Sequence, residues 1–200
     1  MKNLFSIFII VLIFINPSQL NAKEITLAGG CFWCMEHDFE SLEGINNVQS
    51  GYSGGDTLNP TYENHEGHQE AVLVNYDSSI IELETILRAY FRNIDPLDGE
   101  GQFCDRGNSY RPVIFYEDLD EKDKAKNALI FASKELGVSV DKIKVELKSR
   151  NEFWVAEDYH QDYAKNNELK YKFYRYACGR DKRLDQVWGD NSKKASSWSK

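Results

Sequence analysis

Two cysteines, Cys31 and Cys34, are the first residues in this chain whose types and spacing could do chemistry. They follow two glycines within residues 28–34, sequence AGGCFWC. The apolar residues 25–28 before them predict a buried strand, and apolar residues at helical spacing then predict a helix ending near Gly44. Cys31 is therefore expected at a helix N-terminus, where free N–H groups and the helix dipole favour a thiolate, so we predict a lowered pKa and a reactive sulfur. The alternative is an inert cysteine that packs the start of the helix.

Cys31 and Cys34 are expected on one face of the first helical turn. Their separation there suits a disulfide, which favours reversible oxidation. A structural zinc site needs four ligands, and no second Cys-x-x-Cys is present. His65 and His68 lie near each other in a polar loop but lack the spacing of a helical zinc motif.

Glu70 directly precedes the apolar run at residues 71–74. A carboxyl at the end of a buried strand loses water, which raises its pKa and suits it to donate a proton. The alternative is an ordinary glutamate in water at a strand edge. Asp105 lies in a loop that it could hold by local hydrogen bonds, and Tyr62 and Tyr110 lie in loops where a phenol can donate a hydrogen bond to a substrate.

Strands and helices must hold these side chains, and the pattern predicts a single α/β (α+β) domain. Apolar runs at 48–52, 71–74 and 113–116 predict strands, with 71–74 central and buried on both faces. Helical stripes lie between them, and no repeat or linker interrupts the chain. The long connections 51–70 and 95–111 are candidates for function because they exceed the usual loop length.

The two ends of the chain differ from its centre in composition. Lys2, an apolar run over residues 4–15, the break Asn16-Pro17-Ser18 and a small residue at Ala22 predict a signal peptide over residues 1–22. We therefore expect an exported protein, most simply periplasmic, with secretion or an uncleaved signal anchor as alternatives. The domain is expected over residues 23–178, and residues 179–200 are expected to form a polar, loosely attached tail.

Charge and cysteine count restrict the function further. Residues 1–22 hold one lysine and no acidic residue, so the remaining 178 residues carry a net charge of −9. An acidic chain without a basic patch argues against nucleic acids and anionic membranes as partners. All four cysteines lie in this part, and an even count in an exported protein also permits structural disulfides. A domain of this size does not need them for stability, which favours redox chemistry.

Five ordered motifs resemble the A-type peptide methionine sulfoxide reductases. They are GCFW at 30–33, GYSGG at 51–55, NPTY at 59–62, GHQEAV at 67–72 and DRGNSYR at 105–111. Phe153 and the segment EDYHQ at 157–161 also resemble the C-terminal part of that family. The resemblance covers about residues 25–179 and implies a two-layer α/β sandwich around a ferredoxin-like core.

The resemblance also implies the roles of individual residues. Cys31 matches the nucleophile that attacks the sulfoxide sulfur, and Glu70 matches the acid that protonates the sulfoxide oxygen. Tyr62 and Tyr110 match the phenols that hold this oxygen. Phe32 and Trp33 match the apolar surface that receives the substrate methyl group, and Asp105 matches a supporting carboxylate. The implied enzyme reduces the S epimer, has no metal or organic cofactor, takes electrons from a thioredoxin-like protein or another dithiol, and is expected to be a monomer.

The chain departs from the family pattern at its other cysteines. Many members carry glycine where Cys34 stands and resolve the sulfenic acid with cysteines in a flexible tail. We expect Cys34 to be the resolving thiol because it is one turn from Cys31, with Cys178 as the alternative. Cys104 has no predicted role. The link at residues 63–66 is shorter than is common, which affects the expected geometry between Tyr62 and Glu70.

Two other functions compete with sulfoxide reduction. One is general thiol–disulfide exchange through Cys31 and Cys34, which needs neither the acid at Glu70 nor the loop tyrosines. The other is a non-enzymatic exported module, held by two disulfides or binding a metal through His65 and His68.

Overall fold

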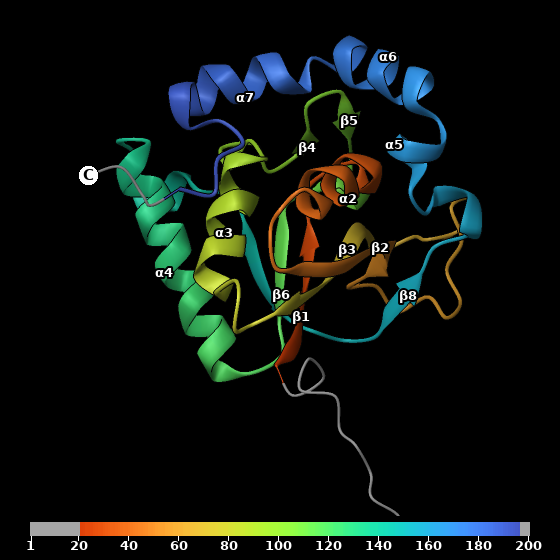
Figure 1. The fold of residues 1–200 in the computed structure, drawn as a ribbon, viewed down its shortest axis with the longest axis horizontal. Coiled ribbons are helices and arrows are strands. Elements are labelled where there is room, and N and C mark those ends of the chain that lie inside the picture. The colour runs from red at the N-terminus through yellow and green to blue at the C-terminus, as the bar shows by residue number, and fades with distance from the viewer. Residues whose placement is uncertain (1–20, 197–200) are drawn as a thin grey trace, which may run out of the picture.

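The computed structural model describes residues 21–196 (Figure 1). Residues 1–20, which hold nearly all of the predicted signal peptide, and residues 197–200 lie outside the described residues. Within the described part, strands and helices are interspersed along the chain and form one α/β domain, as the sequence predicts.

A six-stranded sheet runs through the molecule in the order β7-β6-β1-β3-β2-β8. Its strands are β1 (Ala22–Ala28), β2 (Ile45–Ser53), β3 (Gln69–Asp77), β6 (Val113–Tyr116), β7 (Glu146–Ser149) and β8 (Phe153–Val155). Neighbours pair antiparallel except β6 and β7, which are parallel. A separate two-stranded hairpin consists of β4 (Gly101–Gln102) and β5 (Asp105–Arg106). The predicted central, buried strand at residues 71–74 is confirmed within β3.

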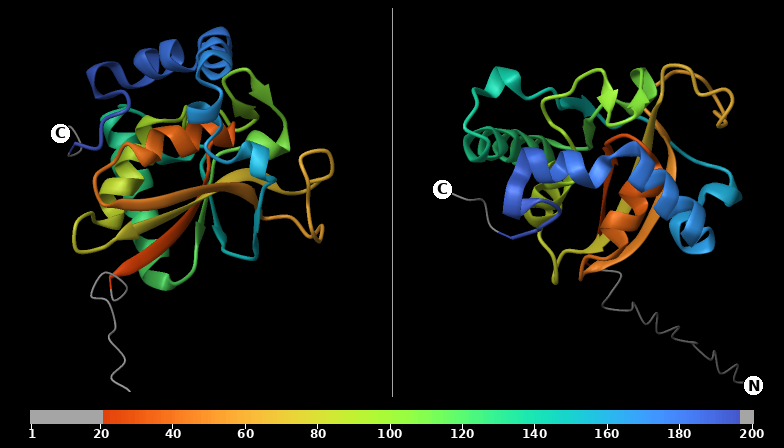
Figure 2. Two further views of the ribbon diagram at one scale, coloured as in Figure 1. Left: turned by 45° about the vertical axis from the view of Figure 1, so that its right-hand side comes forward. Right: turned by 90° about the horizontal axis from the view of Figure 1, so that it is seen from above.

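Helices pack around this sheet and along one end of it (Figures 1 and 2). They are α2 (Phe32–Glu40), α3 (Leu83–Arg92), α4 (Leu119–Glu135), α5 (Tyr163–Asn166), α6 (Glu168–Cys178) and α7 (Arg180–Trp188). α2 packs on β2 and β3, whereas α3 and α4 pack on each other beside β6. α6 and α7 follow one another along the end of the sheet at which α2 begins (Figure 1).

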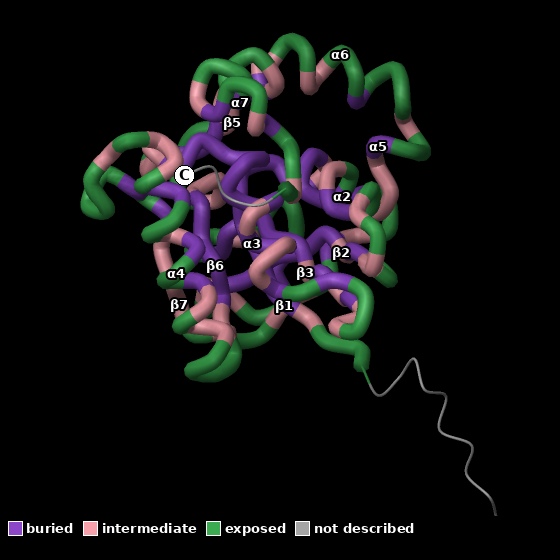
Figure 3. The backbone as a smooth tube through the Cα atoms, turned by 60° about the vertical axis from the view of Figure 1, so that its left-hand side comes forward, coloured by how far each residue is buried: buried purple, intermediate pink, exposed green. Residues whose placement is uncertain are grey.

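The main core fills the space between the sheet and α2 and α3, where the backbone is mostly buried (Figure 3). Phe32, Met35 and Phe39 recur at helical spacing on α2, and all three are buried. Val72 and Val74 of β3 face this core, because alternate residues of a strand point to the same side. A smaller cluster of buried residues holds Ala71, the residue of β3 before Val72, and its neighbours: Ala28, Ala71, Val113 and Phe115.

The predicted loosely attached tail is wrong for the described part of residues 179–200. Residues 180–188 form α7, whose Leu184 and Trp188 belong to the main core. The Trp188 indole donates a hydrogen bond to the Ile94 carbonyl at 3.0 Å, and buried Arg180 donates to the Asn93 carbonyl at 2.7 Å. The segment is polar on average, but its few apolar residues share one face of α7, and this face packs against the core.

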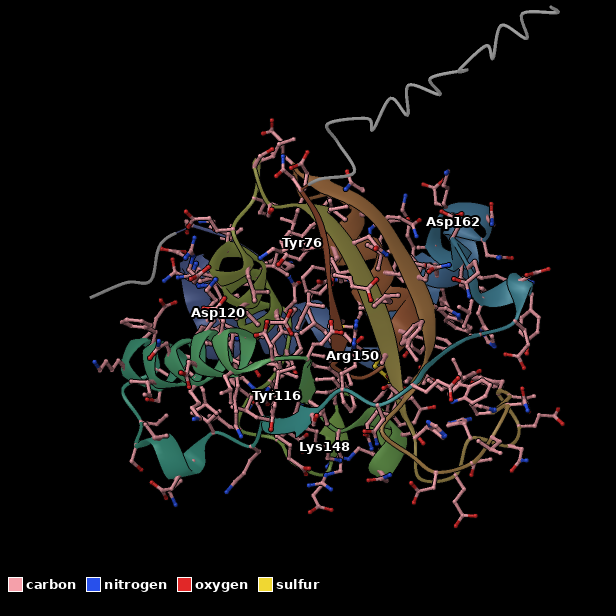
Figure 4. The ribbon with its side chains drawn as sticks, turned by 90° about the horizontal axis from the view of Figure 1, so that it is seen from below. Tyr76, Tyr116, Asp120, Lys148, Arg150 and Asp162 are labelled. Atoms are coloured by element: carbon pink, nitrogen blue, oxygen red, sulfur yellow. A yellow bond between two sulfur atoms is a disulfide. The ribbon has the colours of Figure 1, made fainter. Side chains whose placement is uncertain are left out.

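Polar contacts hold the opposite end of the sheet, which is seen from below in Figure 4. Arg150 donates to Glu24 at 2.6 Å and to Glu117 at 2.7 Å, and so links the start of β1 to the turn after β6. Among residues 21–196, no helix combines the length and apolar character needed to cross a membrane.

Candidate active site

A small cavity of about 50 Å³ lies where α2, β3 and α6 meet the hairpin and its following loop. Its lining residues are Cys31, Phe32, Trp33, Tyr62, Glu70, Asp105, Tyr110 and Tyr174. Seven of these were singled out from the sequence, and the fold brings all seven together from distant parts of the chain. Tyr174 is the additional residue. Cys34 and Cys178 do not line the cavity.

The turn before α2 places Cys31. Gly30 has a φ of +84°, which glycine adopts without strain, and a Cβ at Gly29 would lie 2.7 Å from Ile94 Cγ2. Cys31 is the N-cap of α2, and its carbonyl accepts hydrogen bonds from the backbone N–H groups of Cys34 and Met35 at 3.1 and 3.3 Å. The predicted position at the helix start is confirmed.

The predicted lowering of the Cys31 pKa is wrong. Cys31 is 5% exposed, and burial raises the pKa of its thiol well above the usual value, with further increases from Cys34 and the nearby Glu70. The helix N-terminus favours a thiolate, but in a dry cavity the loss of water outweighs it. Deprotonation of Cys31 therefore needs help from neighbouring groups.

Cys34 is a free, buried thiol one turn from Cys31. Its pKa is lowered, first by a hydrogen bond with Cys31 and then by the positive charges of Arg180 and Arg175, which together outweigh burial. The pKa is thus raised at Cys31 and lowered at Cys34, so the thiolate is favoured at Cys34.

Glu70 is buried at the start of β3, and its Oε2 accepts a hydrogen bond from the Phe32 backbone N–H at 3.1 Å. Burial raises the pKa of Glu70 to about 8, although the hydrogen bonds from Phe32 and Tyr110 oppose this shift. The predicted loss of water at Glu70 is confirmed, and the alternative of a water-exposed glutamate is excluded. At neutral pH this carboxyl holds a proton beside the Cys31 sulfur.

Glu157 holds the loop that carries Tyr62. Its two carboxylate oxygens accept hydrogen bonds from the Tyr62 backbone N–H at 2.9 Å and from the Tyr52 hydroxyl at 3.0 Å. Tyr62 itself is 39% exposed, so its ring lies at the rim of the cavity. The shorter link at residues 63–66 still brings Tyr62 and Glu70 to the same cavity.

Trp33 is fixed on both sides. Its ring stacks on Tyr163 with centroids 3.7 Å apart, and its indole N–H donates to Nδ1 of His160 at 3.0 Å. His160 is buried within the aromatic cluster, where it holds the Trp33 indole.

Cys104 and Cys178 form a disulfide with a Cα separation of 5.0 Å. Cys178 is thus held in a disulfide in this structure, whereas Cys34 is a free thiol beside Cys31. Both sulfurs lie near Asp105: Cys104 Sγ is 3.7 Å from Oδ1 and Cys178 Sγ is 3.9 Å from Oδ2. The disulfide therefore fastens the end of α6 to the hairpin that carries Asp105.

Tyr174 was missed in the sequence. Its hydroxyl donates to Asp105 Oδ2 at 2.6 Å, and its ring meets Trp33 edge-on. The signal was present, because Tyr171, Tyr174 and Cys178 share one face of α6 at helical spacing. Because the chain has eleven tyrosines, this one did not stand out in the sequence.

The structure gives no support to a metal site at His65 and His68. His68 Nδ1 accepts from the Gly55 backbone N–H at 3.2 Å, and its Nε2 lies 2.9 Å from the Thr57 carbonyl, so both ring nitrogens are occupied. Within residues 21–196, the one cluster of three potential ligands is Cys104, Asp105 and Cys178, two of which are joined in the disulfide.

Comparison with known proteins agrees with this arrangement. Residues 23–192 match the family model described as peptide methionine sulfoxide reductase. The chain belongs to the peptide methionine sulfoxide reductase family. The match extends through α7, which places that helix inside the family domain rather than in a tail.

Curated relatives are of the A type. The chain is 46% identical to peptide methionine sulfoxide reductase MsrA 2 of Caulobacter vibrioides over 166 residues, covering 81% of this chain and 83% of that protein. It is also 46% identical to MsrA/MsrB of Vibrio cholerae over 179 residues, covering 88% of this chain but 47% of that protein. The chain thus spans about half the length of the latter reductase. The predicted A-type reductase is confirmed.

Solved structures of this family share the fold. Reduced Mxr1 of Saccharomyces cerevisiae matches with a TM-score of 0.68 and 26% identity, covering 74% of this chain and 87% of that chain. A second Mxr1 structure, in complex with Trx2, matches with a TM-score of 0.53 and 24% identity, covering 76% of this chain and 91% of that chain.

Proposed function

We propose that this reductase converts methionine S-sulfoxide, free and in proteins, to methionine, with Cys31 as nucleophile and Glu70 as acid. The observation that carries the proposal is the pairing of a sulfur at a helix start with a buried carboxyl whose pKa is about 8. A carboxyl protonated at neutral pH is what sulfoxide reduction needs and disulfide exchange does not.

In the first step, the Cys31 sulfur attacks the sulfoxide sulfur. Glu70 gives its proton to the sulfoxide oxygen, and Tyr62 and Tyr110 donate hydrogen bonds to that oxygen as negative charge develops. The bonds from the substrate sulfur to oxygen and to Cys31 break as the oxygen, now a hydroxyl, passes to the Cys31 sulfur. Methionine leaves, and Cys31 is a sulfenic acid. Phe32 and Trp33 offer the apolar surface for the substrate methyl group, and Asp105 supports the site.

In the second step, Cys34 resolves the sulfenic acid. Its sulfur already has a hydrogen bond to Cys31, and its lowered pKa favours the attacking thiolate. Attack on the Cys31 sulfur releases water and forms the Cys31–Cys34 disulfide. Neighbouring positions on one helical turn allow this bond with little backbone movement.

A thioredoxin-like dithiol then reduces this disulfide and restores both thiols. Support comes from yeast Mxr1, whose structure was solved in complex with Trx2. No metal or organic cofactor takes part in the proposed cycle. We expect the reductase to act as a monomer.

We also propose export, with the periplasm as the destination, on the composition of residues 1–22. Oxidised methionines of exported proteins would then be the substrates. At the level of fold, the segments β1, α2, β2, β3, α3 and β6, with strand order β6-β1-β3-β2, support a ferredoxin-like core.

The test uses the protein without residues 1–22, dithiothreitol as reductant, and the two separated sulfoxide epimers. Turnover of the S epimer alone, lost in Cys31→Ser, is the expected result. Reduction of neither epimer, with intact reduction of a model disulfide, would instead assign the Cys31–Cys34 pair to general thiol–disulfide exchange.

A further inference from the structure

His160 contacts two of the side chains that line the cavity, although it does not line the cavity itself. Its Nδ1 accepts a hydrogen bond from the Trp33 indole N–H at 3.0 Å, and its ring centroid lies 4.9 Å from that of Phe32. The histidine is 1% exposed. It therefore acts on the surface proposed for the substrate methyl group from the protein side.

The hydrogen bond from Trp33 defines where the His160 ring carries its proton. Because Nδ1 accepts, the neutral ring holds its hydrogen on Nε2, which is buried and has no hydrogen-bond partner among residues 21–196. Glu157 Oε2 lies 3.9 Å from Nε2, beyond hydrogen-bond distance. Burial lowers the pKa of His160 and outweighs the opposite effect of Glu157, so the ring is neutral at neutral pH and Nδ1 stays an acceptor.

Two different contacts orient the Trp33 ring. Tyr163 stacks on its face with centroids 3.7 Å apart and an interplanar angle of 8°, which fixes the plane of the ring. A stacked ring can still turn within that plane, and the hydrogen bond to His160 removes this freedom. Trp33 is only half-buried, so these contacts are needed to hold it.

His160 is itself fixed to the sheet. Its backbone N–H donates to the Glu157 carbonyl at 2.8 Å. The side chain of the next residue, Gln161, bonds to both backbone groups of Ser50 in β2, each at 3.0 Å. The acceptor for the Trp33 N–H is therefore held in a constant position relative to the strand.

We infer that His160 is a positioning residue that orients Trp33 before the substrate binds and so determines which sulfoxides fit. The cavity has a volume of only about 50 Å³, so a shift of the indole changes what it accepts. An ordered wall costs less free energy to order when the substrate methyl group arrives, and it does not move aside for a longer alkyl group. The inference rests on the proposed function in taking Trp33 as part of the methyl surface.

The test compares His160→Leu with His160→Asn. The two new side chains are similar in size, but only the amide can accept the Trp33 N–H. Rapid mixing of reduced enzyme with the S epimer, without added reductant, gives the maximal rate and the half-saturating concentration of a single turnover. In His160→Leu we expect the half-saturating concentration to rise roughly fivefold, the net effect of one hydrogen bond, with the maximal rate within about twofold of the parent. His160→Asn should stay near the parent, as should the control His37→Leu, whose histidine is exposed on α2.

Substrate preference gives a readout that a merely structural role would not move. The ratio of single-turnover efficiency with methionine sulfoxide to that with ethionine sulfoxide should fall in His160→Leu and be kept in His160→Asn. When both variants are made in a Trp33→Phe protein, which lacks the N–H, they should no longer differ. Equal values for the two variants in the presence of Trp33, or a difference that persists in Trp33→Phe, would overturn the inference.

A measurement without sulfoxide separates this inference from the proposed function. In nuclear magnetic resonance spectra of protein with isotope-labelled tryptophan, the Trp33 N–H should exchange slowly with deuterium in the parent and in His160→Asn, and faster in His160→Leu. The Trp188 N–H, which donates to the Ile94 carbonyl at 3.0 Å, is the internal reference and reports that the variant is folded. If the parent reduces neither epimer, the proposed function fails, whereas equal exchange of the Trp33 N–H in parent and His160→Leu overturns the inference.

A second variant decides the matter if His160→Leu does not fold. Replacement of Trp33 with benzothienylalanine, which has sulfur in place of the N–H, keeps the shape of the ring and leaves His160 in place. The half-saturating concentration should rise as in His160→Leu. An unchanged value would overturn the inference.

Discussion

The two cysteine pairs of this reductase differ in almost every physical respect. Cys31 and Cys34 are buried free thiols one helical turn apart, whereas Cys104 and Cys178 are 74 positions apart, closer to the surface and joined in a disulfide. The first pair adjoins a protonated carboxyl and positive charge, and the second adjoins Asp105. The Cys31–Cys34 pair is suited to chemistry because its thiols are close in sequence and lie in a polar, water-poor site. The Cys104–Cys178 pair is far apart in sequence and joins distant segments.

This contrast shows why a count of cysteines is a weak guide to which of them form disulfides and which do chemistry. All four lie in one domain, and three full pairings are possible from sequence alone. Only the fold shows that Cys178 lies at the end of α6 beside the hairpin, where Cys104 meets it. If one pair serves chemistry and the other structure, variants of the two pairs should change different properties of the protein.

The largest effect is expected for Cys31→Ser. Loss of the nucleophile should reduce turnover of the S epimer roughly a thousandfold or more, with either dithiothreitol or thioredoxin as reductant. Cys104→Ser is the matched control from the other pair and should retain turnover. Similar losses in the two variants would contradict the division between the pairs.

Glu70→Gln should lower kcat for sulfoxide reduction by about 10²–10⁴-fold, because the amide cannot donate the proton that the sulfoxide oxygen needs. The Cys31–Cys34 pair should still reduce a model disulfide at its usual rate. Exposed Glu66, in the loop before β3, provides the control variant, Glu66→Gln. A loss of both activities would mean that Glu70 holds the fold of the site rather than serving as an acid.

Cys34→Ser should abolish turnover with thioredoxin but leave turnover with dithiothreitol, since a small thiol can reach the sulfenic acid directly. One turnover without reductant should leave a sulfenic acid that dimedone traps on Cys31, detected by mass spectrometry. Cys178→Ser should show no such accumulation. Trapping in Cys178→Ser instead would transfer the resolving role to the second pair.

The pH dependence should follow Glu70. Its pKa of about 8 lies above the ordinary value, so the protonated acid is present below pH 8 and is lost as the pH rises through it. We expect kcat with dithiothreitol to fall about tenfold per pH unit above pH 8, measured with the thiol kept at constant thiolate concentration. In Glu70→Gln this decline should be absent.

The smallest effect on turnover is expected for Cys178→Ser, whose main consequence should be on stability. Opening a loop between residues 74 positions apart should cost about 4 kcal/mol in the free energy of unfolding by the chain-entropy relation. Denaturant unfolding under oxidising conditions measures this loss. Equal stability of variant and parent would show that the other contacts of α6 hold it without the disulfide.

Much of the site could be predicted because local patterns place its residues. The turn at Gly30 and the helical spacing from Phe32 fix Cys31 at a helix start, and the apolar run after Glu70 fixes its burial. The Cys31 pKa was predicted in the wrong direction, because helix position is visible in sequence whereas the depth of burial depends on segments folded over it. Tyr174 and the α7 packing were missed for the same reason, since both depend on contacts between residues 69 to 151 positions apart.

The buried Arg180 also has a consequence for the order of events during synthesis. Its guanidinium reaches the carbonyl of Gly29, so the turn before Cys31 is completed by a residue made 151 positions later. Trp188 closes the core after that. A growing chain therefore carries Cys31 in an unfinished setting until nearly all of the domain has been made, and its sulfurs are open to premature oxidation throughout that time.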